Sequence, residues 1–137
     1  RYPALGSILR SIRAIPISRH NPREDFKSVM NHGCQLLKDD WSIVVFPQAT
    51  RSIEFKPATF SSIGVKLARR AKVAVIPCAL KTDFQQPGRL IKDLGRIVPE
   101  NDLYFRFGPA IAPGTPPRDA HGTVVQFIQD GLAEWKR

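Results

Sequence analysis

Short apolar runs alternate with longer segments of helical periodicity along this chain, and that alternation restricts its fold more than any other feature. The apolar runs lie at residues 14–17, 42–46, 73–80 and 103–107. The run at 42–46 is apolar after Ser42 and stops at Pro47, which has no N–H to give to a strand ladder. It therefore predicts a parallel strand that is buried on both faces. Residues 103–107 alternate instead, as in a strand with one buried face.

Apolar side chains recur at helical spacing between these runs. The clearest helix is expected at residues 22–38, with further helices at 3–13, 60–71 and 119–135. Residues 81–99 lack periodicity and contain the turn signal Pro87-Gly88, which predicts a functional loop or a short hairpin over the active site. The pattern predicts an α/β fold with a mostly parallel central sheet flanked by helices, as a single domain over residues 1–137.

Polar side chains follow the strand expected at 42–46. Ligands of α/β sheets bind at the carboxyl ends of strands, so the chemistry is expected on residues 48–52. The guanidinium of Arg51 offers a planar fork of donors that suits a phosphate, and Thr50 and Ser52 add hydroxyl groups. The sequence therefore predicts a phosphate site in this loop.

The same stretch resembles the Phe-Pro-Glu-Gly-Thr-Arg-Ser block of the glycerolipid acyltransferases, which make phosphatidic acid and related lipids from lysophospholipids. The stretch reads Phe46-Pro47-Gln48-Ala49-Thr50-Arg51-Ser52. Gln48 replaces the usual glutamate and keeps its reach without its charge, while Ala49 replaces a glycine. Either departure is expected to shift substrate preference or weaken activity.

Three further blocks carry the resemblance, in the order and spacing of the family. Residues 14–19 are similar to the block whose final arginine is associated with binding glycerol phosphate, which implies that role for Arg19. Residues 55–58 resemble the Phe-Lys-x-Gly block, which implies a charge from Lys56 at the edge of the pocket. Residues 73–77 resemble the strand that closes the family's core. The resemblance implies a glycerol-3-phosphate acyltransferase-like fold, with Gln48 ordering the loop or donating to the substrate.

The family's first block, a histidine and an aspartate separated by four residues, is expected upstream of Arg1. In that pair the histidine removes the proton from the acceptor hydroxyl and the aspartate orients its imidazole. The chain is therefore expected to be the C-terminal portion of an acyltransferase domain and to be inactive alone.

His20 and Asp25 have the spacing of the catalytic pair but lie directly after Arg19, where the family has no such pair. A helix start explains them as well, with Asn21 as the N-cap, Pro22 as the first helical residue and Asp25 in the first turn. The helix start is the favoured interpretation. His32 and His121 fall on expected helices, as solvated or packed side chains.

The composition indicates an anionic partner. Lysine and arginine number 21 against 12 acidic residues, a formal net charge of +9. This charge suits acyl-coenzyme A, an acyl carrier protein, a lysophospholipid and an anionic membrane surface. Nucleic acid is disfavoured, because the basic residues are scattered and no aromatic stacking platform accompanies them. Cys34 and Cys78 are expected to be free and reduced.

The function expected from the resemblance is transfer of a fatty acyl group from a thioester to a lysophospholipid or glycerol phosphate. No metal or organic cofactor is expected, since the thioester already carries the activation. The protein is expected at the cytoplasmic face of a membrane, as a peripheral protein. Two alternatives stay open: a non-catalytic module that binds lysophospholipid or acyl chains, and a small polyanion-binding protein.

Overall fold

The structure is a computed structural model that describes residues 3–18, 20–48, 54–84, 86, 88 and 95–135. The chain divides into two compact units, Arg1–Val44 and Val45–Arg137, which we call the N-terminal unit and the C-terminal unit. The single domain over residues 1–137 expected from the sequence stays a prediction.

The N-terminal unit contains two helices, α1 (Pro3–Ser11) and α2 (Pro22–Lys38). The start of α2 confirms the predicted cap, because Asn21 Oδ1 accepts the N–H groups of Arg23 and Glu24 at 3.2 and 3.4 Å. Pro22 occupies the first turn, where its missing N–H has no helical partner to lose. The bounds of α2 agree with those expected from the sequence.

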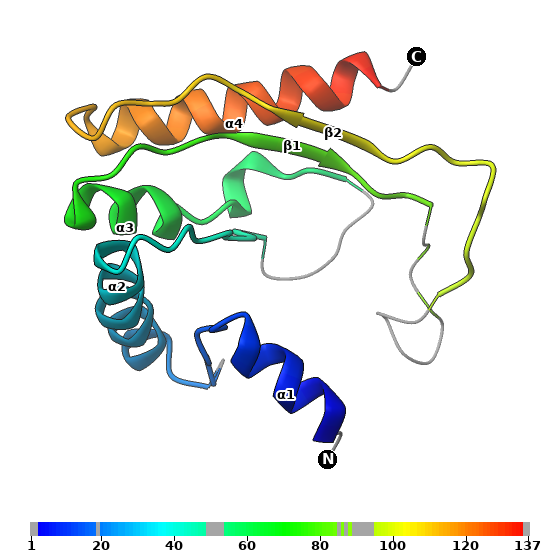
Figure 1. Cartoon of the computed structure of the whole chain (residues 1–137). Helices are drawn as coiled ribbons and strands as arrows, with labels where there is room; N and C mark the ends of the chain where they lie inside the picture. The colour runs from blue at the N-terminus through cyan, green and yellow to red at the C-terminus, as the bar shows by residue number, and fades with distance from the viewer. Residues whose placement is uncertain are drawn as a thin grey trace. The chain divides into compact units, whose positions relative to one another are not determined.

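The C-terminal unit is a helix–sheet layer. It contains the short 3₁₀ turn η1 (Pro57–Thr59), the helices α3 (Ile63–Ala71) and α4 (Pro117–Glu134), and the strands β1 (Cys78–Lys81) and β2 (Tyr104–Phe107). The two strands are antiparallel, and α4 runs along them (Figure 1). A bridge between Val75 and Ile111 extends their pairing toward α3.

The core of the C-terminal unit lies between α3, α4 and the strand pair. Its buried members are Val65, Ala120, Val124 and Ile128, against which Phe55, Phe60, Val75, Ile111 and Leu132 pack. The side chains of Val124, Ile128 and Leu132 on α4 therefore belong to the core. Burial of such side chains contributes about 1.5–3 kcal/mol each.

The predicted mostly parallel sheet is wrong for the described part of the chain, where the sheet is the antiparallel pair β1–β2. Residues 14–17 and 42–46, expected as strands, belong to no strand within the described part of the chain. Val44 and Phe46 are 78% and 74% exposed, whereas Val45 lies against Gly64 of α3. Only one side of this run is covered, so the burial on both faces that its apolar character predicted is wrong.

One face of the strand pair is open to solvent. In the register, Cys78 lies opposite Phe107 and Leu80 opposite Phe105, so these four side chains share a face. The rings of Phe105 and Phe107 meet edge to face at 4.7 Å and are 60% and 64% exposed. Ala79, on the other face, is fully buried against α4.

The segment between β1 and β2 includes a second backbone pairing. The N–H of Gln86 donates to the carbonyl of Arg96, and the N–H of Val98 donates to that of Phe84. This agrees with the hairpin that was one of two expectations for residues 81–99. No helix among the described residues is both long and apolar enough to span a bilayer.

Candidate functional site

The candidate site is the loop of residues 48–60, of which the structure describes the two ends. Gln48 and Lys56 are both exposed. Thr50, Arg51 and Ser52, and also Arg19 in the N-terminal unit, lie outside the described residues. The structure therefore describes how the loop is held and where two of its five expected site residues lie.

The loop is closed at its base. The N–H of Ser61 donates to the carbonyl of Pro47 at 3.2 Å, which joins the residue before the loop to the residue after it. Just outside this bond, Val45 packs on Gly64, where a Cβ would lie 3.6 Å from Val45 Cβ. Both ends of the loop are thus fixed to the first turn of α3.

The second half of the loop is anchored to the core by two aromatic rings. Phe55 and Phe60 meet edge to face at 5.2 Å, and Phe60 also lies 5.9 Å from the ring of His121 on α4. Between the two rings, the carbonyl of Lys56 accepts the N–H and the hydroxyl of Thr59, both at 3.1 Å. The backbone of Lys56 is therefore fixed, while its ammonium group remains in solvent.

His121 was expected to be solvated or packed, and it is packed. Its Nδ1 is buried and has no hydrogen-bond partner within the described residues. Its contact with Phe60 joins α4 to the loop, a link that sequence reasoning missed because the two residues are 61 positions apart.

In the N-terminal unit, Asp25 binds the residue that precedes Arg19. Asp25 Oδ1 accepts the N–H of Ser18 at 2.7 Å and the hydroxyl of Ser18 at 3.1 Å. Ser18 Oγ in turn accepts the N–H of His20 at 3.2 Å. These contacts support the helix-start interpretation, because Asp25 serves the turn before α2. Sequence reasoning did not single out Ser18. The pattern that could have predicted its contact with Asp25 is a small hydroxyl residue seven positions before an acid in the first turn of a helix.

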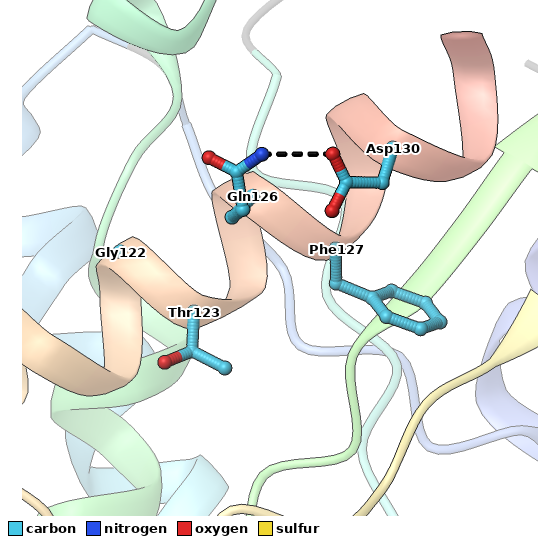
Figure 2. A pocket seen from close by; sticks show the side chains of 5 residues that line it. All are labelled: Gly122, Thr123, Gln126, Phe127 and Asp130. Atoms are coloured by element: carbon cyan, nitrogen blue, oxygen red, sulfur yellow. Dashed lines mark hydrogen bonds between the residues drawn. The ribbon is translucent and has the colours of Figure 1, made fainter. Parts of the chain in front are cut away.

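A hollow of about 420 Å³ lies on α4 and is lined by Gly122, Thr123, Gln126, Phe127 and Asp130. Figure 2 shows Gln126 and Asp130 one turn apart, joined by a 2.8 Å hydrogen bond. Gln48 and Lys56, the two expected site residues that the structure describes, do not line this hollow. The amide of Gln126 donates to Asp130 and the hydroxyl of Thr123 donates to the carbonyl of Asp119, so the described lining presents no acid–base pair for acyl transfer.

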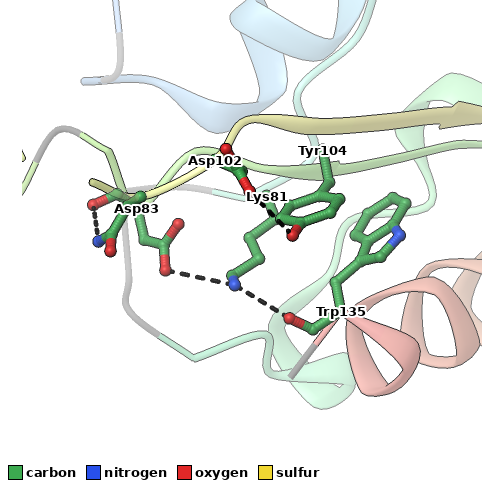
Figure 3. A network of polar contacts seen from close by, with 6 residues as sticks. Lys81, Asp83, Asp102, Tyr104 and Trp135 are labelled. Carbon is green, nitrogen blue, oxygen red and sulfur yellow. Dashed lines mark hydrogen bonds and ion pairs between the residues drawn. The ribbon is translucent and has the colours of Figure 1, made fainter. Parts of the chain in front are cut away.

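A polar and aromatic cluster joins the end of α4 to the sheet (Figure 3). Lys81 Nζ donates to the carbonyl of Trp135 at 3.0 Å and lies 3.5 Å from Asp83. The rings of Tyr104 and Trp135 stack at 5.4 Å. A cation at a helix C-terminus is favourable because the last carbonyls lack helical partners.

Arg106 extends this cluster on the solvent side. Its guanidinium binds both carboxylate oxygens of Glu134, at 2.7 and 2.8 Å, and lies over the ring of Trp135. The hydrogen bonds to Glu134, and then its charge, raise the pKa of Arg106 above its ordinary value. The pair is exposed, so we assign it to holding the helix end rather than to chemistry.

A comparison with protein families points to the same family that the loop sequence resembles. The family model described as Acyltransferase matches residues 1–81, which is more than half of the chain and includes the loop of residues 48–60. No curated protein and no solved structure gives a significant match. On the strength of the family match, this chain belongs to the acyltransferase family.

Proposed function

We propose that the protein transfers a fatty acyl group from an acyl thioester to the hydroxyl of a lysophospholipid or a glycerol phosphate. The observation that carries the proposal is the family match over residues 1–81, within which the block of residues 46–52 falls. The donor is acyl-coenzyme A or an acyl carrier protein. The net charge of +9 supports both, as well as an acceptor held at an anionic membrane surface.

The chain's contribution is to hold the acceptor's phosphate. Arg51 provides a bidentate fork for two phosphate oxygens, with Thr50 and Ser52 as hydroxyl donors and Arg19 as a second cation. A phosphate held in this way fixes the neighbouring hydroxyl in one position, which makes its attack effectively intramolecular. Lys56 adds positive charge at the edge of the pocket, supported by its exposed side chain and fixed backbone.

In the transfer itself, the acceptor oxygen forms an ester bond to the thioester carbonyl carbon as the carbon–sulfur bond breaks. The hydroxyl proton passes to the histidine of the family's His-x4-Asp block, and the thiolate leaves with the bonding electron pair. Gln48 orders the loop or donates to the substrate. The proposed location is peripheral, on the cytoplasmic face of a membrane.

The test is an acyl-transfer assay of the intact protein with a panel of lysolipid acceptors and both kinds of thioester. Arg51→Ala is expected to raise the acceptor KM tenfold or more, since hydrogen bonds to charged groups contribute about 1.5–3 kcal/mol. Arg51→Lys keeps the charge but loses the planar fork of donors. Its acceptor KM is expected to lie between those of the unchanged protein and Arg51→Ala. Arg70→Ala, on the exposed face of α3, is the matched control for loss of one charge. Unchanged kinetics in Arg51→Ala would remove this site assignment.

A second candidate is a non-catalytic module that binds lysophospholipid or acyl chains. It is favoured by Gln48 and Ala49, which replace the glutamate and glycine of the family's block. This candidate predicts saturable lysophospholipid binding by the intact protein without turnover of any thioester. Gln48→Glu with Ala49→Gly would then restore the family's residues without producing transfer.

A further inference from the structure

The first helix of the N-terminal unit presents apolar and basic side chains together to solvent. Leu9 is 43% exposed, and Ile12, directly after α1, is 60% exposed. Arg10 and Arg13 follow them one residue on and are exposed too. Leu9 and Ile12 are three residues apart, so their side chains lie close together at the end of the helix. A short helix of this kind is typical of the boundary between water and a bilayer.

Trp41 extends this surface from the segment after α2. The guanidinium of Arg13 lies over its ring, 4.6 Å from the centroid, and the side chain is 41% exposed. Tryptophan is enriched at bilayer interfaces, because its ring is apolar and its N–H is polar. We call Leu9, Arg10, Ile12, Arg13 and Trp41 the α1 surface.

The backbone of Arg13 is left-handed, with a φ of 51°. Its N–H donates to the carbonyl of Arg10 at 3.1 Å, and the N–H of Ala14 donates to that of Leu9 at 3.0 Å. This is the helix ending in which glycine is the usual residue, because a side chain there costs free energy. The chain has an arginine at this position, and that arginine is the one that lies on Trp41.

The segment that contains α1 carries charge of one sign. Residues 1–23 include five arginines and no acidic residue. The acids nearest to Trp41 along the chain are Asp39 and Asp40, and Asp39 accepts a hydrogen bond from Gln35 of α2 at 3.0 Å. An anionic surface therefore complements the charge of this segment. The exposed apolar side chains favour a bilayer over nucleic acid, whose phosphates offer them nothing.

We infer that the α1 surface binds an anionic phospholipid bilayer. Leu9, Ile12 and the ring of Trp41 enter the boundary between headgroups and acyl chains. The long side chains of Arg10 and Arg13 keep their guanidinium groups at the level of the lipid phosphates. The inference rests on the peripheral location in the proposed function, but it needs neither the phosphate ligands of residues 48–60 nor the transfer chemistry.

The experiment measures binding of the 137-residue chain to vesicles by co-sedimentation. The vesicles are phosphatidylcholine alone, or phosphatidylcholine mixed with an equal amount of phosphatidylserine. Binding to the mixed vesicles should be at least about tenfold stronger and should fall as salt is raised. Arg10→Gln with Arg13→Gln should lower it about tenfold, because each basic residue near an anionic surface adds to the attraction.

Two matched controls separate this surface from general charge and apolarity. Arg69→Gln with Arg70→Gln removes two exposed charges from α3 and should lower binding less than about threefold. Ile12→Ser should lower binding about fivefold, because its side chain loses the apolar boundary. Ile97→Ser, at a residue that is 56% exposed in the C-terminal unit, should change binding less than about twofold.

Tryptophan fluorescence reports the contact while the α1 surface stays unchanged. The chain has two tryptophans, so Trp135→Phe leaves Trp41 as the sole emitter. Its emission should move to shorter wavelength when the mixed vesicles are added, and lipids with brominated acyl chains should quench it. This measurement decides the question even where a variant of the α1 surface does not fold.

Each result either supports or overturns the inference. Absence of binding to the mixed vesicles, equal losses in the α1 and α3 arginine pairs, or Trp41 emission that brominated lipid leaves unquenched would overturn it. A DNA duplex that displaces the vesicles, with binding that falls in the α1 variants, would assign the surface to nucleic acid instead. Acyl transfer is assayed separately, with water-soluble glycerol phosphate as acceptor. Turnover without vesicle binding would remove this inference alone, and vesicle binding without turnover would remove the proposed transfer alone.

Discussion

Gly131 of α4 lies directly against Ala79 of β1. A Cβ built on Gly131 would stand 2.9 Å from the Cβ of Ala79, closer than such atoms approach in real proteins. Ala79 is fully buried, and its methyl group has no rotamer through which to move away. The absence of a side chain at residue 131 therefore sets how closely α4 approaches the strand pair.

Gly131→Ala is expected to destabilise the protein by about 1–3 kcal/mol, the usual range for overpacking a closed contact. The free energy of unfolding from urea titration measures this. Gly122→Ala on the same helix is the control, because a Cβ there has no neighbour within 4 Å. That substitution should stabilise by roughly 0.5–1 kcal/mol through helix propensity. Equal stabilities for the two variants would contradict the close approach of α4 to β1.

His20→Ala is expected to leave kcat of the intact protein within about threefold. The physical reason is that Asp25, the acid at the spacing of a catalytic pair, binds Ser18 and so holds the turn before α2. The substitution keeps the backbone N–H that His20 donates to Ser18. A steady-state acyl-transfer assay checks this, with Arg51→Ala as the positive control. Loss of general-base catalysis costs about 10²–10⁴-fold, so a drop of that size would make His20 the base.

The open face of the strand pair should bind an apolar dye. Phe105 and Phe107 expose most of their ring surface beside Leu80. Contiguous apolar surface of this kind attracts apolar molecules. Replacing both phenylalanines by threonine should lower the fluorescence of bound anilinonaphthalene sulfonate by at least about half. Ile97→Thr, at an exposed residue outside β1 and β2, is the control. Equal fluorescence from all variants would show that the dye binds elsewhere.

Cys78 should be alkylated slowly in the folded protein. Burial raises the pKa of its thiol, so the thiolate, which is the reactive form, is scarcer at any given pH below that pKa. In a Cys34→Ser background, the rate with iodoacetamide should rise with pH and reach its midpoint at a higher pH than for the same chain in denaturant. A midpoint that is the same in both states would contradict the effect of burial on this thiol.

Local chemistry made some elements predictable. The start of α2 could be predicted because Asn21 and Pro22 act within one turn of the chain, and their contacts are those expected. The alternation predicted a strand near residues 103–107, and β2 confirms the strand. The buried face is not the apolar one, however, because Phe105 and Phe107 are exposed while Tyr104 and Arg106 face α4 through Trp135 and Glu134. In both cases, the residues that determine the element lie within it or beside it.

Strand pairing could not be predicted in the same way. The apolar run at residues 42–46 indicated burial, but pairing depends on which backbone lies beside it, and that partner is distant in sequence. The contacts of the candidate site divide similarly. Gln48 and Lys56 could be proposed as site residues from the sequence of the loop alone. The Phe60–His121 contact could not, because it depends on how α4 packs.

The bond between Pro47 and Ser61 has a consequence for how the protein diverges over time. Because the residues on either side of the loop are joined and Phe55 and Phe60 hold its second half on the core, replacements at residues 48–54 leave the path of the chain into α3 unchanged. Gln48, Ala49 and their neighbours can therefore vary while the helices and strands beneath remain as they are.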